Sequence, residues 1–174
     1  VAINLTGYRL NKGSFNEDLQ ELLRRTGCSP DAIEIEITEE YIVQRAESAL
    51  KDLDHLREMG VRIAVDDFGT GYSSLSYLKE LPVDKLKIDR SFICDLEKSS
   101  GGQKIITALL AMARELDLAV VAEGVETEQQ KQFLQERGCH SVQGYFFSQP
   151  ITADELTAMV SAQNVVQMKK EQRP

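Results

Sequence analysis

The 174-residue chain has little cysteine, no long apolar run and a deficit of positive charge. Its three cysteines, Cys28, Cys94 and Cys139, are too few and too scattered for a disulfide framework or a zinc site, and their odd number favours a reducing compartment. The sequence has no secretory signal and no run near the ~20 apolar residues of a membrane span. A net charge of −8 argues against non-specific nucleic-acid binding. We therefore expect a cytoplasmic protein that binds neither DNA nor RNA.

Strand-like and helix-like segments alternate along most of the chain. Apolar segments predict six strands, at residues 1–5, 33–38, 61–65, 85–88, 118–122 and 140–146. Helical periodicity and capping residues predict helices between them, including one long helix over residues 42–56 and a short one over 73–79. Ser14 is a candidate cap for the first helix, and Thr127 and Thr152 open candidate capping boxes. We expect one domain over residues 1–162 and a polar tail over 163–174.

Strands that alternate with helices predict a parallel sheet, which either a doubly wound fold or a barrel would satisfy. Polar residues end the successive strands: Asn4, Glu36, Asp66, Asp67, Lys87, Glu123 and Gln143. In a barrel these ends converge on one face, where active sites are built, whereas in an open sheet they spread along an edge. The pattern therefore favours an α/β (β/α)8 TIM-like barrel. Because a full barrel has eight strands, this barrel is expected to be incomplete, with about six.

Four carboxylates, Glu36, Asp66, Asp67 and Glu123, lie at the ends of apolar strands. Unpaired carboxylates that are partly buried in a common mouth would be costly, and a bound cation removes that cost. Hard oxygen ligands without a histidine or cysteine cluster suit Mg²⁺ or Mn²⁺. Two such metals that share a carboxylate are a common device for phosphodiester hydrolysis. The alternative is that these residues only end strands and cap helices.

Lys87 and a glycine-containing loop are two further candidates. Lys87 alternates with Lys85 and Asp89 on one face of a strand, where it would orient a water, neutralise a phosphate or serve as a buried ion-pair partner. The loop over residues 67–74 contains Gly69 and Gly71 and is either a gating segment or an ordinary turn. It matches neither the dinucleotide fingerprint nor the P-loop. His140 begins a strand and is expected at the amino end, away from the mouth.

Six motifs occur in order along residues 1–160. They are VAINL (1–5), EITE (36–39), DDFGTGYSSL (66–75), KLKID (85–89), AEGVET (122–127) and QGYFFSQP (143–150). This set resembles the EAL domain family. The resemblance implies a modified (β/α)8 barrel that hydrolyses cyclic di-GMP, a bacterial second messenger, to the linear dinucleotide with Mg²⁺ or Mn²⁺.

The resemblance also implies roles for individual residues. Asn4, Glu36 and Asp66 would bind one metal, and Asp66 would bridge to a second metal held by Asp67 and Glu123. Lys87 would contact the attacking water or the phosphate, and Gln143 would support the site. Glu39 would anchor the loop after Asp67, with Glu126 close by. The catalytic set is then Lys87, Glu123, Asp66, Asp67 and Gln143.

The sequence departs from the family at one position that matters. The Glu-Ala-Leu motif, whose glutamate is implied as a metal ligand, is absent, so the barrel is expected to lack its first strands. Open sheet edges favour pairing with another chain, and a homodimer is a reasonable expectation. We expect this chain to be weakly active or inactive, whereas its parent, with sensor or GGDEF modules upstream, is a phosphodiesterase.

Two other functions fit parts of the pattern. A catalytically silent EAL-like domain would bind cyclic di-GMP or dock a protein partner, but silent members often lose the carboxylates that are retained here. An unrelated barrel aldolase or isomerase would use Lys87 to form a Schiff base. The surrounding carboxylates and the order of the motifs disfavour that reading.

Overall fold

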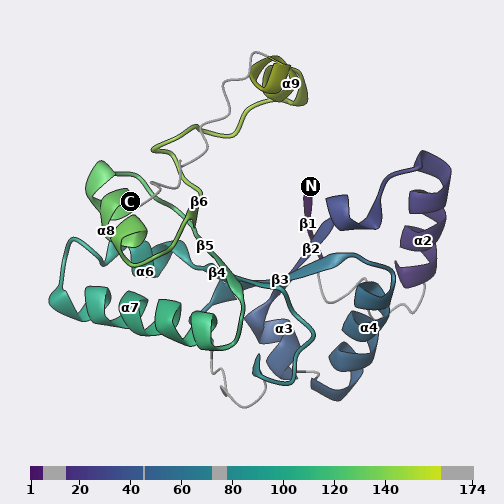
Figure 1. The fold of residues 1–174 in the computed structure, drawn as a ribbon, viewed down its shortest axis with the longest axis horizontal. Helices are drawn as coiled ribbons and strands as arrows, with labels where there is room; N and C mark the ends of the chain where they lie inside the picture. The colour runs from purple at the N-terminus through teal and green to yellow at the C-terminus, as the bar shows by residue number, and fades with distance from the viewer. Residues whose placement is uncertain (6–14, 45, 72–77, 162–174) are drawn as a thin grey trace, which may run out of the picture.

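A computed structural model describes residues 1–5, 15–44, 46–71 and 78–161 of the chain. Its six strands form one parallel sheet in sequence order (Figure 1). They are β1 (Ala2–Asn4), β2 (Glu34–Thr38), β3 (Arg62–Phe68), β4 (Lys85–Ile88), β5 (Ala119–Ala122) and β6 (Ser141–Val142). A doubly wound sheet would reverse its strand order at a switch point, and this sheet does not. The sheet instead curves into an open half-barrel, which confirms the expected incomplete barrel.

Helices follow the strands along the chain, and all but the last of them lie on the outer side of the curved sheet (Figure 1). They are α2 (Phe15–Thr26), the short 3₁₀ helix η1 (Pro30–Ala32), α3 (Glu39–Gln44), α4 (Ala46–Glu58), α6 (Arg90–Cys94), α7 (Ser100–Glu115), α8 (Glu128–Glu136) and α9 (Ala153–Ser161). Helices α3, α4 and α7 pack directly on the strands, and α2 packs on α4. Helix α9 stands clear of the sheet, with Leu156 and Met159 exposed.

Local sequence signals account for several element boundaries. Thr127 and Gln130 form the predicted capping box at the start of α8. The second predicted box is also present, because Thr152 N donates to Glu155 Oε2 at 2.7 Å and Glu155 N donates to Thr152 Oγ1 at 3.3 Å. Gly60, with φ +88°, follows α4 as expected. These caps satisfy backbone groups that a helix end leaves without partners.

Two predicted boundaries are wrong. The expected long helix is divided into α3 and α4, on either side of residue 45. The expected strand over residues 140–146 is only the two-residue β6, because the chain turns sharply at Gly144. A β-carbon at Gly144 would lie 2.1 Å from the carbonyl oxygen of Val125, so this close approach admits only glycine. The Ser14 cap, most of the helix over 73–79 and the tail over 163–174 lie outside the described residues.

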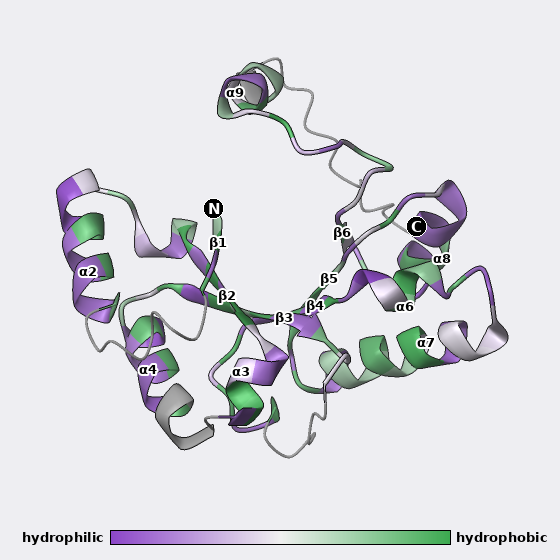
Figure 2. Cartoon of the chain, turned by 180° about the vertical axis from the view of Figure 1, so that it is seen from behind, coloured by the Kyte–Doolittle hydropathy of each residue, from purple (hydrophilic) through white to green (hydrophobic). Residues whose placement is uncertain are grey.

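The core lies between the outer face of the sheet and the helices. Ile35 of β2 and Ile63 of β3 are fully buried, in one cluster with Leu53 and Leu56 of α4. A second cluster contains Ile88, Ile106 and Leu134. Figure 2 shows hydrophobic residues concentrated on the strands and along α7. Because strand side chains alternate between faces, the residues between these apolar positions face the inside of the half-barrel.

No helix in the described part of the chain is both long enough and apolar enough to cross a lipid bilayer. Cys139 is also part of the core, and burial raises the pKa of its thiol to about 11. Its thiol is therefore neutral at physiological pH.

The Ile63→Ala substitution tests the core. It deletes a side chain that is 0% exposed, so we expect the free energy of unfolding to fall by about 2–5 kcal/mol through lost contacts and a residual cavity. Urea unfolding followed by circular dichroism measures the change. The matched control is Ile105→Ala on α7, where the side chain is 48% exposed and the change should stay within about 0.5 kcal/mol. Equal losses in both variants would contradict this core.

Candidate active site

The predicted polar residues lie on the inner face of the half-barrel, at the carboxyl ends of its strands. Asn4 of β1 is in register with Glu36 of β2. Asp66 lies near the end of β3 and Lys87 near the end of β4. Glu123 directly follows β5, and its N–H donates to Ile88 O at 3.1 Å. Parallel pairing in sequence order therefore brings side chains from five separate motifs to one mouth.

The Lys87 ammonium is at the centre of this group. Its Nζ lies 2.8 Å from Glu123 Oε1 and 2.9 Å from Glu36 Oε2. Asp66 Oδ1 lies 3.0 Å away. The Lys87 side chain is only 7% exposed, so these ion pairs are largely shielded from water. Lys87 is thus a buried ion-pair partner, the structural alternative that the sequence left open.

The charges in the cluster shift one another's protonation equilibria. Burial disfavours the Lys87 ammonium, but hydrogen bonds to the three carboxylates outweigh it and hold the pKa of Lys87 well above its usual value. Burial raises the pKa of Glu123, and the hydrogen bond from Lys87 offsets this only in part. Repulsion from Asp66 and Glu36 raises it further. One ammonium among three carboxylates leaves the mouth negatively charged.

Asn4 faces the same carboxylates from β1. With its amide nitrogen turned toward them, it donates to Glu36 Oε2 at 3.2 Å and to Asp66 Oδ2 at 3.3 Å. Turned the other way, its amide oxygen would face those carboxylate oxygens, which is favourable only with a cation between them. The role of Asn4 therefore depends on which way its side-chain amide is turned. With the nitrogen toward the carboxylates it donates hydrogen bonds to them, and with the oxygen toward them it can be a ligand to a cation.

Asp67 takes a different direction from its neighbour Asp66. The pairing of β3 with β4 shifts register between Val65 and Phe68, and Asp67 has φ 53°. The backbone therefore turns at this pair, as expected from its place at a strand end. Burial raises the pKa of the Asp67 carboxyl, and repulsion from Asp66 adds to the shift. Within the described ranges, Asp67 forms no ion pair with Lys87, so the backbone turn separates the two carboxylates.

Glu39, at the start of α3, holds the loop that follows Asp67. Its Oε2 accepts a hydrogen bond from Gly69 N at 2.6 Å, and the residue is 3% exposed. A β-carbon at Gly71 would lie 2.7 Å from Glu39 Oε1, so the loop passes close to this carboxylate at Gly71 as well as at Gly69. Residues 72–77, which include Ser73 and Ser74, lie outside the described part of the chain.

Three other residues at this end have contacts outside the Lys87 cluster. Gln143 follows β6, is exposed, and donates its backbone N–H to Ala122 O at 2.8 Å. Glu126 forms an exposed ion pair with Arg90 at 2.5 Å. Asp89 caps α6 with its side chain, so the face shared by the lysines of β4 does not extend to it. The structure thus brings Gln143 to the rim of the mouth and places Glu126 on the surface beside it.

Sequence reasoning missed a second ion pair deeper in the half-barrel. Lys85 Nζ of β4 contacts Glu34 Oε2 of β2 across the intervening strand β3. Each residue lies two positions before a member of the Lys87 cluster, so both pairs share the inner face. The signal was present in the alternation of Glu34 with Glu36 and of Lys85 with Lys87. On the intervening strand, the small residue Ala64 is in register with Lys85.

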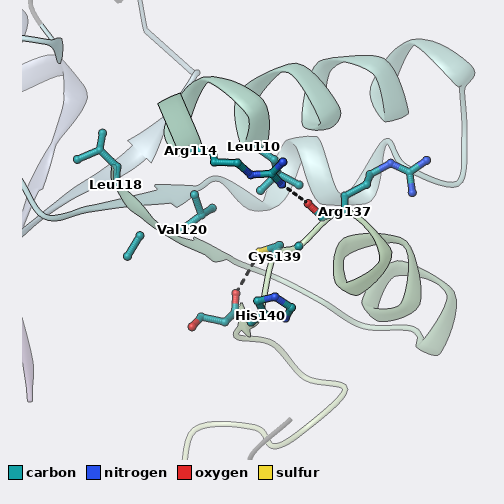
Figure 3. A pocket seen from close by; sticks show the side chains of 10 residues that line it. Leu110, Arg114, Leu118, Val120, Arg137, Cys139 and His140 are labelled. Atoms are coloured by element: carbon teal, nitrogen blue, oxygen red, sulfur yellow. Dashed lines mark hydrogen bonds between the residues drawn. The ribbon is translucent and has the colours of Figure 1, made fainter. Parts of the chain in front are cut away.

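Cavities adjoin the sheet at both of its ends. One of about 400 Å³ adjoins the mouth and is lined by residues that include Thr38 and Asp67. Another, of about 290 Å³, lies at the opposite end of β5 and β6 (Figure 3). Arg114 and His140 line it, and Arg114 Nη2 donates to Arg137 O at 3.2 Å. His140 is therefore at the amino end of the strands, remote from Lys87, as its position in the sequence predicts.

The donor set of the mouth has the chemistry of a site for a hard divalent cation. Its oxygen donors are the carboxylates of Glu36, Asp66 and Glu123 and the amide of Asn4, without thiol or imidazole groups. Within the described residues, no three histidine, cysteine, aspartate or glutamate side chains are disposed to hold a metal ion. The three carboxylates converge instead on the Lys87 ammonium. The residues fit Mg²⁺ or Mn²⁺ by donor type, and the ligand set stays a prediction.

The structure is a parallel half-barrel with carboxylates gathered around one lysine at the carboxyl ends of its strands. Comparison with known proteins identifies the family that has this architecture. The family model described as "EAL domain" matches residues 1–150. Cyclic di-GMP phosphodiesterase NbdA of Pseudomonas aeruginosa is 44% identical over 162 residues, which cover 93% of this chain and 21% of the relative. The bifunctional diguanylate cyclase/cyclic di-GMP phosphodiesterase MucR of the same organism is 42% identical over 161 residues, 92% of this chain and 24% of MucR.

Solved structures agree. The MucR phosphodiesterase in complex with c-di-GMP gives a TM-score of 0.86 at 42% identity and covers 89% of this chain and 63% of that chain. BlrP1 of Klebsiella pneumoniae, solved with c-di-GMP and either manganese or calcium, gives a TM-score of 0.80 at 37% identity, over 86% of this chain and 38% of that chain. The chain belongs to the EAL domain family, and it spans about a fifth to a quarter of the length of these curated relatives.

The Glu39→Ala substitution tests the anchoring of the loop. It removes the acceptor of the Gly69 N–H, and a lost hydrogen bond of about 1 kcal/mol corresponds to about fivefold faster amide exchange. Hydrogen exchange measured by NMR reports the Gly69 amide directly. Glu40→Ala changes the exposed neighbour on α3 and should leave that rate unaltered. A Gly69 amide that exchanges at the same rate in both variants would contradict the anchoring.

Proposed function

We propose that this chain is part of a metal-dependent phosphodiesterase domain that hydrolyses cyclic di-GMP to the linear dinucleotide. The observation that carries the proposal is the convergence of Glu36, Asp66 and Glu123 on Lys87 at the carboxyl end of a parallel half-barrel. That end is the face on which barrel enzymes build their active sites. NbdA and MucR, which are both named as cyclic di-GMP phosphodiesterases, support the substrate.

The proposed metal ligands are the oxygen donors of the mouth. Asn4, Glu36 and Asp66 would hold one divalent ion, and Asp66 would be shared with a second ion held by Asp67 and Glu123. Bound Mg²⁺ or Mn²⁺ would supply Lewis acidity toward the phosphate and would lower the pKa of a water at neutral pH. The manganese and calcium in the BlrP1 structures support a divalent ion at this site.

The remaining side chains have roles that their positions suit. Lys87 would donate a charge-assisted hydrogen bond to a phosphate oxygen, where negative charge grows as the P–O bond breaks. Glu123, whose pKa burial raises, is suited to accept a proton from the attacking water. Gln143 would contact the dinucleotide from the rim. Glu39 would hold the loop after Asp67 over the ligand, with Glu126 and Arg90 at its outer side.

We expect this chain to turn over more slowly than a complete EAL domain. The Glu-Ala-Leu motif does not occur in its sequence, so one implied carboxylate ligand is absent from the chain. Removal of one ligand weakens the hold on the metal and on the nucleophile it activates. The edge strands β1 and β6 also leave the inner face of the half-barrel partly exposed.

Incubation with cyclic di-GMP and Mn²⁺, followed by chromatographic separation of the products, tests the proposal. We expect slow formation of the linear dinucleotide, and Asp66→Asn should reduce its rate by about 100-fold or more, because it removes a charge from both metal-ligand sets. The matched control is Asp117→Asn, in the loop before β5, where φ 56° is tolerated by asparagine.

Each outcome of that assay discriminates. Linear product that disappears in Asp66→Asn and persists in Asp117→Asn supports the phosphodiesterase. Turnover equal to that of a complete EAL domain contradicts the weakened site. Binding of cyclic di-GMP without product, measured by calorimetry on the same samples, favours a receptor. If the chain neither binds nor hydrolyses cyclic di-GMP, the proposed substrate is wrong.

A further inference from the structure

Lys87 and Asn4 direct hydrogen-bond donors at the same carboxylate oxygens that a cation would use. With the Asn4 amide nitrogen turned toward the carboxylates, Glu36 Oε2 accepts from both, with Lys87 Nζ at 2.9 Å and the Asn4 nitrogen at 3.2 Å. Asp66 also receives both, Lys87 on Oδ1 and Asn4 on Oδ2. These two carboxylates therefore each accept at least two hydrogen bonds from the protein itself.

Because the cluster is buried, loss of any of these hydrogen bonds would leave a carboxylate oxygen without a partner. The side chains of Glu36 and Asp66 are 9% and 14% exposed, so little water is available to replace a lost donor. Carboxylates this close repel one another strongly at low dielectric, and an unpaired one is costly. The ammonium of Lys87 therefore does for the carboxylates what a divalent cation would do: it compensates their charge and holds them together.

We propose that Lys87 and Asn4 are an internal substitute for the divalent cation and compete with it for Glu36 and Asp66. To admit a metal, Lys87 must withdraw from at least one carboxylate, and the Asn4 amide must rotate to present its oxygen. This inference rests on the proposed function and goes beyond it. It says that Lys87 lowers the affinity of the site for the metal, although the same ammonium would bind a phosphate oxygen of the substrate. Withdrawn from the carboxylates, the ammonium is free to meet a phosphate oxygen.

The competition has a consequence that can be measured. A lysine that merely orients the carboxylates would lower metal affinity when it is removed. A lysine that competes for them would raise it, because its removal frees donor oxygens and eliminates repulsion between the ammonium and the incoming cation. We expect Lys87→Met, which retains the apolar length of the side chain, to bind Mn²⁺ at least about tenfold more tightly than the unchanged chain.

Lys85 provides a matched control on the same strand. It lies two residues before Lys87 on the same inner face and pairs with Glu34 rather than with the carboxylates of the mouth. Lys85→Met deletes the same charge by the same chemical change. Mn²⁺ affinity in this variant should stay within about twofold of the unchanged chain, because Lys85 contacts none of the proposed ligands.

The experiment uses chains that have been dialysed against EDTA, returned to metal-free buffer and titrated with Mn²⁺. The electron paramagnetic resonance signal of free Mn²⁺ gives the dissociation constant. Lys87→Gln is a second variant, which keeps a hydrogen-bond donor without charge and should have an intermediate affinity. Circular dichroism verifies that each variant is folded. The rise in Tm on addition of Mn²⁺ is an independent readout, and it should be largest for Lys87→Met.

Tighter Mn²⁺ binding by Lys87→Met, with Lys85→Met unchanged, supports the competition. Equal or weaker binding by Lys87→Met overturns it, as does equal tightening in Lys85→Met or a failure of every variant to bind. The hydrolysis assay separates this inference from the proposed function. If the unchanged chain hydrolyses cyclic di-GMP but Lys87→Met binds Mn²⁺ no more tightly, only the proposed competition is wrong. If Lys87→Met binds Mn²⁺ more tightly but the chain neither binds nor hydrolyses cyclic di-GMP, only the proposed phosphodiesterase function is wrong.

Discussion

The arrangement of the mouth depends on one interaction, the convergence of three carboxylates on the Lys87 ammonium. Glu36, Asp66 and Glu123 come from or directly follow three strands, and Lys87 joins them from a fourth. Without the lysine, the carboxylates would repel one another in a partly buried site. The cluster therefore ties β2 to β5 at their carboxyl ends, while the apolar outer face ties the same strands to the helices.

The two faces of the sheet have different tasks. Barrel interiors are usually filled with branched apolar side chains. Here the inner face of β2 and β4 carries two layers of charge, the Lys85–Glu34 pair and, above it, the Lys87 cluster. Apolar burial falls instead on the outer face, where Ile35 and Ile63 pack against α4. Buried ion pairs of this kind contribute little net stability, because the cost of desolvating the charges offsets much of their attraction.

The sequence predicted which residues meet at the mouth but not how they pair. Strand ends could be read from apolar patterns, and parallel order then placed Asn4, Glu36 and Lys87 together. The shortness of β6 depends on a backbone contact between Gly144 and Val125, which no local pattern encodes. The divergence of Asp67 from Asp66 depends on a register shift against β4. Side-chain contacts across β3 likewise depend on tertiary register, so the Lys85–Glu34 pair escaped prediction.

The central claim is that the carboxylates now gathered on Lys87 are the ones that receive a divalent cation. A crystal structure of the chain grown with Mn²⁺, examined for anomalous scattering, tests it most directly. The account predicts an anomalous peak among Glu36, Asp66 and Asn4, with Lys87 Nζ beyond hydrogen-bond distance of at least one carboxylate. Mn²⁺ bound elsewhere, or Lys87 still bonded to all three carboxylates beside a bound ion, would contradict it.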